Sequence, residues 1–204
     1  MFVMFRNPIE REISKYYAMK AASRQPGQQP LQLSLSDYID SEAYNGNLMV
    51  RQLSGEMNPG VNVTLDHLLV AKEVLRRKCF IGLLEQKQET WRRIQKLFHT
   101  RWKMESKHVE PVCEDRYLNW GWRSRNPVKV SIDMTVEDEI LASHEGIIDI
   151  KTYKKIAAKN QLDLLLYEFS KYLFLLQKSL LPGEKPAVKT KEPKTNSTEL
   201  KTKK

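Results

Sequence analysis

Near the start of the chain, a short apolar run gives way to apolar residues at helical spacing. Residues 2–5 form a continuous apolar run, which is typical of a strand buried on both faces. Pro8 follows where the first turn of a helix tolerates proline, and apolar side chains then recur at helical spacing over residues 9–17. The pattern predicts a strand, a tight turn and a helix, which is the leading half of a βαβ unit.

Two short helices are predicted after a loop that is rich in proline and glycine. Ser36 or Ser34 can act as the N-cap of the first, which continues through Ile39. Residues 47–55 predict another helical turn, and Gly55 marks its end because glycine is favoured just past the end of a helix.

A helix, a strand and a second helix follow in succession. Thr64 is the expected N-cap of a helix over residues 65–78. Its predicted apolar face consists of Leu65, Leu68, Leu69, Val74 and Leu75. Residues 79–85 then predict a second buried strand, and residues 90–102 a further helix. This alternation favours an α/β fold with a parallel sheet.

The second half of the chain divides into three parts. Residues 103–133 are irregular and rich in tryptophan, arginine and asparagine, whereas helical patterns return from Thr135 and end near Leu181. Residues 183–204 hold seven lysines against three glutamates and almost no bulky apolar residue. Such a segment cannot bury enough apolar surface to fold, so we expect one domain over residues 1–182 and a disordered Lys-rich tail over 183–204.

Composition adds a preference for anionic partners. The 204 residues carry a formal charge of +9, which suggests phosphates, nucleic acid or acidic lipid. No stretch has the eighteen or so consecutive apolar residues of a membrane helix. The two cysteines, Cys79 and Cys113, are too few and too far apart for a zinc site, and whether they form a disulfide stays open.

The strongest candidate for chemistry is the strand end at Arg6, with Ser14 eight residues later. Anionic ligands bind at the carboxyl ends of parallel strands, where the next helix begins. Arginine can bind a phosphate through two donors, and serine can add a third. The alternative is an arginine at the end of a sheet and a serine without a role on a helix.

The segment FRNPIEREISKYY resembles the 3'-phosphate-binding motif of sulfotransferases that use 3'-phosphoadenosine 5'-phosphosulfate (PAPS). In that motif a strand ends in Arg-(Asp/Asn)-Pro, and a serine and tyrosines lie on the next helix. The resemblance implies that Arg6 and Ser14 bind the 3'-phosphate of the cofactor. Arg11 matches an arginine that is common in the Golgi carbohydrate branch of the family.

Three later segments resemble the same branch, in the same order. They are YNGNLMVRQLSG, FIGLLEQ and IAAKNQLDLLLYEFSKYLF, and with the first motif they cover most of residues 2–177. The resemblance implies a P-loop-like, three-layer parallel sheet flanked by helices, incomplete at the N-terminus and rich in helices at the C-terminus. In the last segment, we expect Asp163 and Tyr167 to cap and pack a helix rather than contact substrate.

The irregular segment YLNWGWRSRNPVK lies where the family has a variable loop over the nucleotide. The resemblance implies that Arg123, Ser124 and Arg125 contact the cofactor, since arginine can bind phosphate and tryptophan can stack on a base. A purely structural loop anchored by Trp120 and Trp122 is the alternative.

Two parts of the family's machinery have no match in the sequence. The loop that binds the 5'-phosphosulfate and the catalytic base are expected upstream of Arg6, which only five residues precede. No histidine falls at the position of the base; the chain has His67, His99, His108 and His144. The catalytic residues are therefore unknown, and we expect the chain to be a truncated and inactive portion, through either a gene model that starts late or a natural truncation.

The resemblance thus implies a transferase that moves a sulfuryl group from PAPS to a carbohydrate hydroxyl, without a metal and without a nucleic-acid partner. It also implies the Golgi lumen, with a membrane anchor on the complete protein, where the Asn62 and Asn196 sequons would matter. One alternative is a non-catalytic protein that binds nucleic acid or another polyanion through runs such as RRK. Another is a helical scaffold whose leucine-rich end pairs with a partner.

Overall fold

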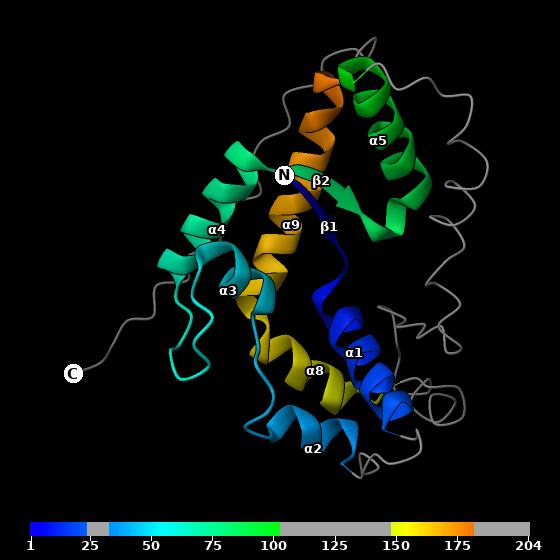
Figure 1. Cartoon of the computed structure of the whole chain (residues 1–204). Coiled ribbons are helices and arrows are strands. Elements are labelled where there is room, and N and C mark those ends of the chain that lie inside the picture. The colour runs from blue at the N-terminus through cyan, green and yellow to red at the C-terminus, as the bar shows by residue number, and fades with distance from the viewer. Residues whose placement is uncertain (24–32, 103–147, 182–204) are drawn as a thin grey trace.

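The computed structural model describes residues 1–23, 33–102 and 148–181, and the structural statements below concern these residues (Figure 1). They form a mostly helical protein with a small two-stranded parallel sheet. The elements in order are β1 (Phe2–Phe5), α1 (Pro8–Ala22), α2 (Leu35–Asp40), α3 (Leu48–Ser54), α4 (Leu65–Lys78), β2 (Phe80–Leu83), the 3-10 turn η1 (Leu84–Gln86), α5 (Lys87–Trp102), α8 (Ile150–Lys159), α9 (Gln161–Leu176) and the 3-10 turn η3 (Gln177–Leu180).

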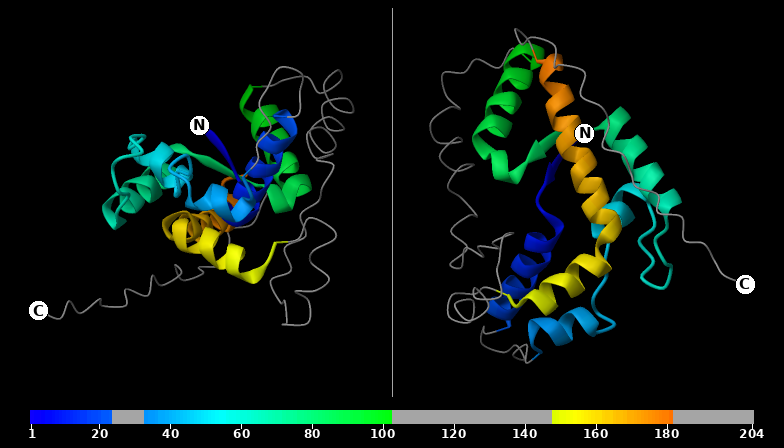
Figure 2. Two further views of the ribbon diagram at one scale, coloured as in Figure 1. Left: turned by 90° about the horizontal axis from the view of Figure 1, so that it is seen from below. Right: turned by 180° about the vertical axis from the view of Figure 1, so that it is seen from behind.

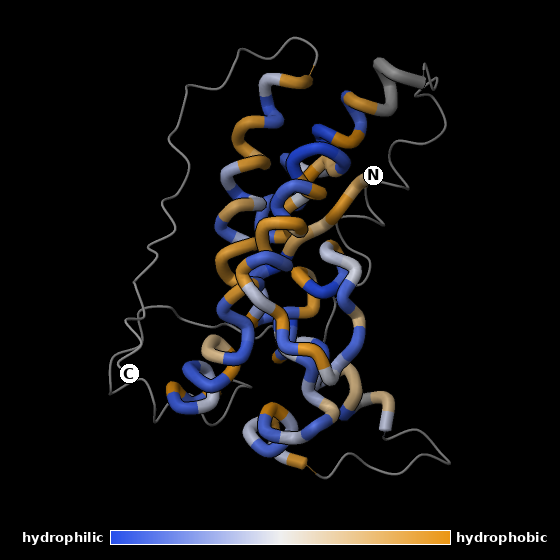
Figure 3. Tube along the Cα trace, turned by 90° about the vertical axis from the view of Figure 1, so that its left-hand side faces the viewer, coloured by the Kyte–Doolittle hydropathy of each residue, from blue (hydrophilic) through white to orange (hydrophobic). Residues whose placement is uncertain are grey.

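The two predicted strands pair in parallel, as the sequence indicates. Their register runs from Phe2 opposite Phe80 to Phe5 opposite Leu83. Burial along β1 is graded, because Phe2 is 41% exposed whereas Phe5 is buried. The expectation of a strand buried on both faces is therefore wrong at the start of β1. Figure 3 shows its apolar run as an orange segment beside the N-terminus.

Side chains close the outer edge of β2. Gln177 accepts a hydrogen bond from the amide of Ile81 at 2.8 Å and donates one to the carbonyl of Cys79 at 2.8 Å. Thr90 accepts from the amide of Leu83 at 3.1 Å and donates to the carbonyl of the same residue at 3.0 Å. These bonds take the place of a neighbouring strand, so a further strand would have to join on the β1 side.

The described residues form two apolar clusters, which are separate in space although each draws residues from both halves of the sequence. Helix α9 runs between α4 and α5 and packs against β2, as Figures 1 and 2 show. The larger cluster lies among β1, β2, α3, α4 and α9. The smaller one lies where α1, α2 and α8 meet, and it is built from Ile9, Ile13, Tyr16, Tyr38, Ile39, Tyr44, Ile148 and Ile156. Helix α1 therefore extends from the sheet into the smaller cluster.

Three predicted helix ends, at Ser34, Gly55 and Thr64, are confirmed. Ser34 is the N-cap of α2, and its hydroxyl accepts from an amide in the first turn. Gly55 ends α3 in the left-handed region, at φ 83°. Thr64 forms a capping box at the start of α4 with His67, whose Nδ1 accepts from the Thr64 amide at 3.1 Å. His67 therefore has a structural role.

The predicted apolar face of α4 is only partly correct. Leu68, Ala71 and Leu75 are the buried residues of this helix, whereas Leu65 and Leu69 are each 62% exposed. The buried residues are three and four positions apart, so one stripe faces the core. The two exposed leucines lie beside that stripe, where the rest of the described chain does not cover them.

Three other expectations concern the start of α5, membrane-spanning helices and the domain boundary. Helix α5 begins at Lys87, three residues earlier than predicted. Among the described helices, none is both long and apolar enough to cross a bilayer. The Lys-rich segment and the domain boundary predicted near residue 182 lie outside the described residues.

Candidate functional site

The Arg-Asn-Pro sequence forms the junction between β1 and α1. Arg6 follows the last residue of the strand, and Pro8 is the first residue of the helix. The Asn7 side-chain oxygen accepts from the amides of Ile9 and Glu10 at 2.9 and 3.5 Å. These bonds satisfy amides that a first helical turn leaves without partners. The turn is thus held by its own sequence, and it fixes the backbone from which the Arg6 side chain projects.

The end of β2 supports this junction from the neighbouring strand. Because the strands are parallel, both carboxyl ends lie at one edge of the sheet. The Asn7 amide donates to Glu85 Oε1 at 2.9 Å, which ties the turn to η1. An open hollow of about 390 Å³ lies over residues 84–89 at the same edge. We define the carboxyl-edge site as Arg6, Asn7, Glu10, Glu85 and Lys87.

Arg6 has donors to offer a ligand at this site. Its Nε donates to Glu10 Oε2 at 3.3 Å, and its side chain is 25% exposed. No hydrogen bond joins its two terminal nitrogens to another residue of the described chain. Lys87 lies close enough for its pKa to be lowered, first by burial and then by the charge of Arg6. Two cations from different elements thus face one edge of the sheet.

Ser14 lies on α1, one turn beyond Glu10. Positions 10 and 14 are four residues apart, so Glu10 and Ser14 share one side of α1, whereas Arg6 precedes the helix, which begins at Pro8. The Ser14 side chain is half-buried, and its hydroxyl has no hydrogen-bond partner within the described residues. The ion pair with Glu10 links Arg6 to the side of α1 that carries Ser14.

Tyr167 of α9 closes the inner side of the site. Its ring is buried, as the sequence interpretation expects. The pKa of its hydroxyl is raised by burial and by the adjacent carboxylate of Glu85, so the phenol stays protonated at neutral pH. Glu85 and Lys87 were missed by the sequence reasoning, although their place directly after a buried strand could have indicated them.

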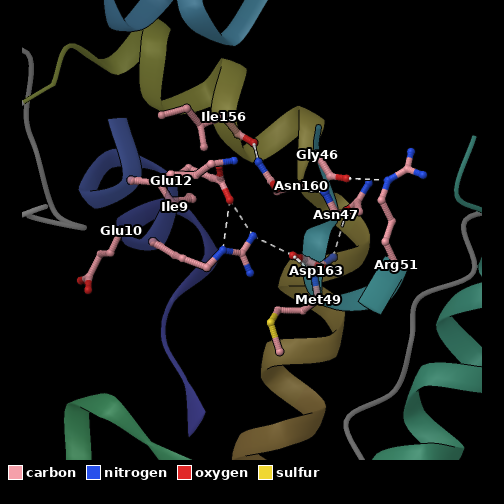
Figure 4. Close-up of polar contacts among 12 residues, drawn as sticks. Ile9, Glu10, Glu12, Gly46, Asn47, Met49, Arg51, Ile156, Asn160 and Asp163 are labelled. Atoms are coloured by element: carbon pink, nitrogen blue, oxygen red, sulfur yellow. Dashed lines mark hydrogen bonds and ion pairs between the residues drawn. The ribbon is translucent and has the colours of Figure 1, made fainter. Parts of the chain in front are cut away.

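Arg11 does not belong to this site. Figure 4 shows the buried cluster that contains Glu12 and Asp163, while Glu10 points away from it. Arg11 Nη2 donates to Glu12 Oε1 and to Asp163 Oδ2, both at 2.8 Å. Burial alone would lower the pKa of the Arg11 guanidinium, but the carboxylates of Asp163 and Glu12 outweigh it and the pKa is raised. Arg11 thus links α1 to α9 inside the protein.

The ends of α3 and α9 cap each other. Asp163 accepts from the amides of Met49 and Val50 at 3.0 and 2.8 Å, at the start of α3. Asn47, which adopts a left-handed conformation at φ 56°, accepts from the amides of Leu162 and Asp163 at 2.9 and 3.0 Å. The capping role expected for Asp163 is confirmed, but the helix that it caps is α3, more than a hundred residues away.

Two further residues of the segment YNGNLMVRQLSG, Gly46 and Arg51, have structural roles near this junction. Gly46 packs against α8 so closely that an added Cβ would lie 2.3 Å from the carbonyl oxygen of Lys159. Arg51 is buried and donates to three carbonyls, those of Gly46, Asn58 and Val61, at 2.9 to 3.2 Å. Arg51 therefore organises the loop between α3 and α4, and Gly46 lets the segment before α3 pack against α8.

The basic runs of the described chain are paired with glutamates. On α4, Arg76 and Arg77 both pair with Glu73. On α5, Glu89 pairs with Arg92 and with Arg93, which is buried beneath the helix. The guanidinium of Arg93 lies 3.6 Å from the centre of the Phe174 ring. One of the three positive charges of each run is thus offset by a glutamate on the same helix, and one arginine is removed from the surface.

Several sequence-derived candidates lie outside the described residues. These are Arg123, Ser124, Arg125, Trp120, Trp122, Cys113, His108 and His144. Cys79 is a buried free thiol, and burial raises its pKa. Within the described ranges, no group of three or more His, Cys, Asp or Glu side chains is arranged to hold a metal ion.

Comparison with known proteins adds no relative. Neither the protein-family models, nor the curated proteins, nor the solved structures contain a match to this chain. The interpretation of the site therefore depends on its own geometry and on the sequence motif.

Proposed function

We propose that this chain is part of a sulfotransferase that uses PAPS, and that the carboxyl-edge site binds the 3'-phosphate of the cofactor. The observation that carries the proposal is the position of Arg6. It follows a parallel strand, its terminal nitrogens are available, and its ion pair with Glu10 links it to the side of α1 that carries Ser14. This is where α/β proteins bind anionic ligands, and the sequence there has the family's motif.

Each residue of the site has a distinct proposed role. The terminal nitrogens of Arg6 bind two phosphate oxygens, and the Ser14 hydroxyl donates to a third. Asn7 and Glu85 act as positioning residues, because their bond at 2.9 Å fixes the turn from which Arg6 projects. The ammonium of Lys87 adds positive potential at the same edge. The cofactor supplies the sulfuryl group.

The fuller architecture is also part of the proposal. Helices α9 and α5 pack against β2, and further strands would extend the sheet on the β1 side, giving the three-layer P-loop-like fold. The carbohydrate acceptor and the Golgi lumen follow from the sequence resemblance alone. No described residue is assigned to the 5'-phosphosulfate or to the catalytic base.

Calorimetry tests the proposal directly. Adenosine 3',5'-bisphosphate should bind more tightly than adenosine 5'-monophosphate, because only the former carries the 3'-phosphate. Arg6→Ala should weaken that binding by about 2 to 4 kcal/mol, and Ser14→Ala by about 1 kcal/mol. Arg77→Ala, which removes an exposed arginine from α4, is the matched control and should leave binding unchanged.

Equal affinities for the two nucleotides would remove the assignment of the 3'-phosphate. If binding were also steeply dependent on salt and indifferent to the nucleotide, the polyanion-binding alternative would be favoured. The glutamates paired with the RRK and RRIQK runs count against that alternative at present.

A further inference from the structure

Glu10 lies in the path of the ligand at the carboxyl-edge site. Its carboxylate accepts from Arg6 Nε at 3.3 Å, and the two side chains are 31% and 25% exposed, so both can be reached from solvent. Glu10 points away from the buried cluster of Glu12 and Asp163 (Figure 4). It is therefore free of the network that holds α1 to α9.

Glu10 shares a guanidinium with the proposed ligand and a helical face with Ser14. Its carboxylate accepts from Arg6 Nε at 3.3 Å, and Ser14 lies one turn further along α1, about 6 Å along the axis at a rise of about 1.5 Å per residue. A phosphate bound to the terminal nitrogens of Arg6 and to Ser14 would therefore lie beside the Glu10 carboxylate. Two anions would then lie within a few ångströms of each other and repel.

We propose that Glu10 is a counter-ion that holds Arg6 in the ligand-free protein and that a bound phosphate must displace. The inference rests on the proposed function, since it concerns the same phosphate. Displacement costs binding energy, so Glu10 lowers the affinity for adenosine 3',5'-bisphosphate and speeds its release. For a transferase, that nucleotide is the product left after sulfuryl transfer.

The neighbouring charges fit this role. Lys87 of α5 faces Arg6 and provides positive potential that remains when Glu10 moves away. Glu85 is already engaged by the Asn7 amide, so it is not free to replace Glu10 on Arg6. The Tyr167 hydroxyl, which stays protonated, lies near the carboxylates of Glu85 and Glu10. Glu10 is thus the carboxylate that shares the Arg6 side chain with the ligand.

The test is Glu10→Gln in the 204-residue chain, with titration of adenosine 3',5'-bisphosphate by calorimetry. Glutamine has the same shape and removes only the charge, so the affinity should rise about five- to tenfold and dissociation should slow. Glu73→Gln on α4 makes the same change in net charge on another exposed Arg–Glu pair and should have no effect. Thermal unfolding of both variants checks that they fold.

An unchanged or weaker affinity in Glu10→Gln would overturn the proposal, because Glu10 would then orient Arg6 rather than compete for it. If neither the wild type nor Glu10→Gln binds the bisphosphate, the proposed function fails. Titration of both with inorganic pyrophosphate then tests separately whether Glu10 competes with an anion for Arg6. A higher affinity of Glu10→Gln than of the wild type for pyrophosphate supports the counter-ion role. Equal pyrophosphate binding, or none to either protein, overturns it.

Discussion

Replacing Asp163 by asparagine should destabilise the protein strongly, although the two side chains have nearly the same shape. The Asp163 side chain is fully buried. Its Oδ2 accepts from the Met49 amide at 3.0 Å and from Arg11 Nη2 at 2.8 Å, and its Oδ1 accepts from the Val50 amide at 2.8 Å. Asparagine keeps the shape but loses the charge and one acceptor.

The magnitude follows from these three donors. If the asparagine oxygen takes the Oδ2 position, the Val50 amide faces an NH₂ group and is left without a partner. If the oxygen takes the other position, both Met49 and Arg11 are left facing a donor. A buried donor without a partner costs about 1 to 3 kcal/mol, and the weaker pairing of Arg11, which keeps Glu12 as its remaining carboxylate, brings the total to about 2 to 4 kcal/mol.

Urea unfolding at pH 7, followed by far-UV circular dichroism, measures this loss. Glu168→Gln is the matched control, because it breaks an exposed ion pair with Lys171 on the same helix and should change stability by less than about 0.5 kcal/mol. A loss below about 1 kcal/mol in Asp163→Asn would refute the reasoning, since the junction of α1, α3 and α9 would then not depend on this carboxylate.

Three further changes test other contacts. Gly46→Ala should cost at least about 2 kcal/mol in the same assay, because its Cβ would clash with a backbone carbonyl of α8, whereas Gly60→Ala should be nearly neutral. Gln177→Ala should cost about 2 to 4 kcal/mol, since it strands two backbone groups at the edge of β2, and no loss would mean that water replaces the side chain. The pKa of Glu89 is lowered to about 2, mainly by a hydrogen bond from Arg92. The ionised Glu89 therefore contributes fully to the stability of the fold above the unfolded pKa near 4.5, and this contribution is lost as the pH falls to about 2. Melting temperatures of the wild type and Glu89→Gln should therefore converge over that range, and a constant difference would contradict this.

Local signals in the sequence were sufficient for the strand–helix junction and for most helix ends. The apolar run of β1, the proline after it and the N-cap at Ser34 each act within a few residues, and the structure bears them out. The shared face of Glu10 and Ser14 could also be predicted from the sequence, because their four-residue spacing within α1 brings them to one side of the helix.

Long-range contacts could not be predicted in the same way. Arg11 lies within the phosphate motif, yet its partner Asp163 is 152 residues away and draws it into the interior. Glu85 reaches the Asn7 amide only because β1 and β2 pair in one register. The exposed face of α4 likewise depends on where α9 packs. Such roles are set by tertiary packing, which a pattern within one helix does not contain.

The most direct test of the central claim is a crystal structure of the chain with adenosine 3',5'-bisphosphate. We expect the 3'-phosphate within hydrogen-bonding distance, about 2.7 to 3.2 Å, of the Arg6 terminal nitrogens and the Ser14 hydroxyl, with the Glu10 carboxylate moved off Arg6. A nucleotide bound elsewhere, with the Arg6–Glu10 pair intact, would contradict the assignment of this site.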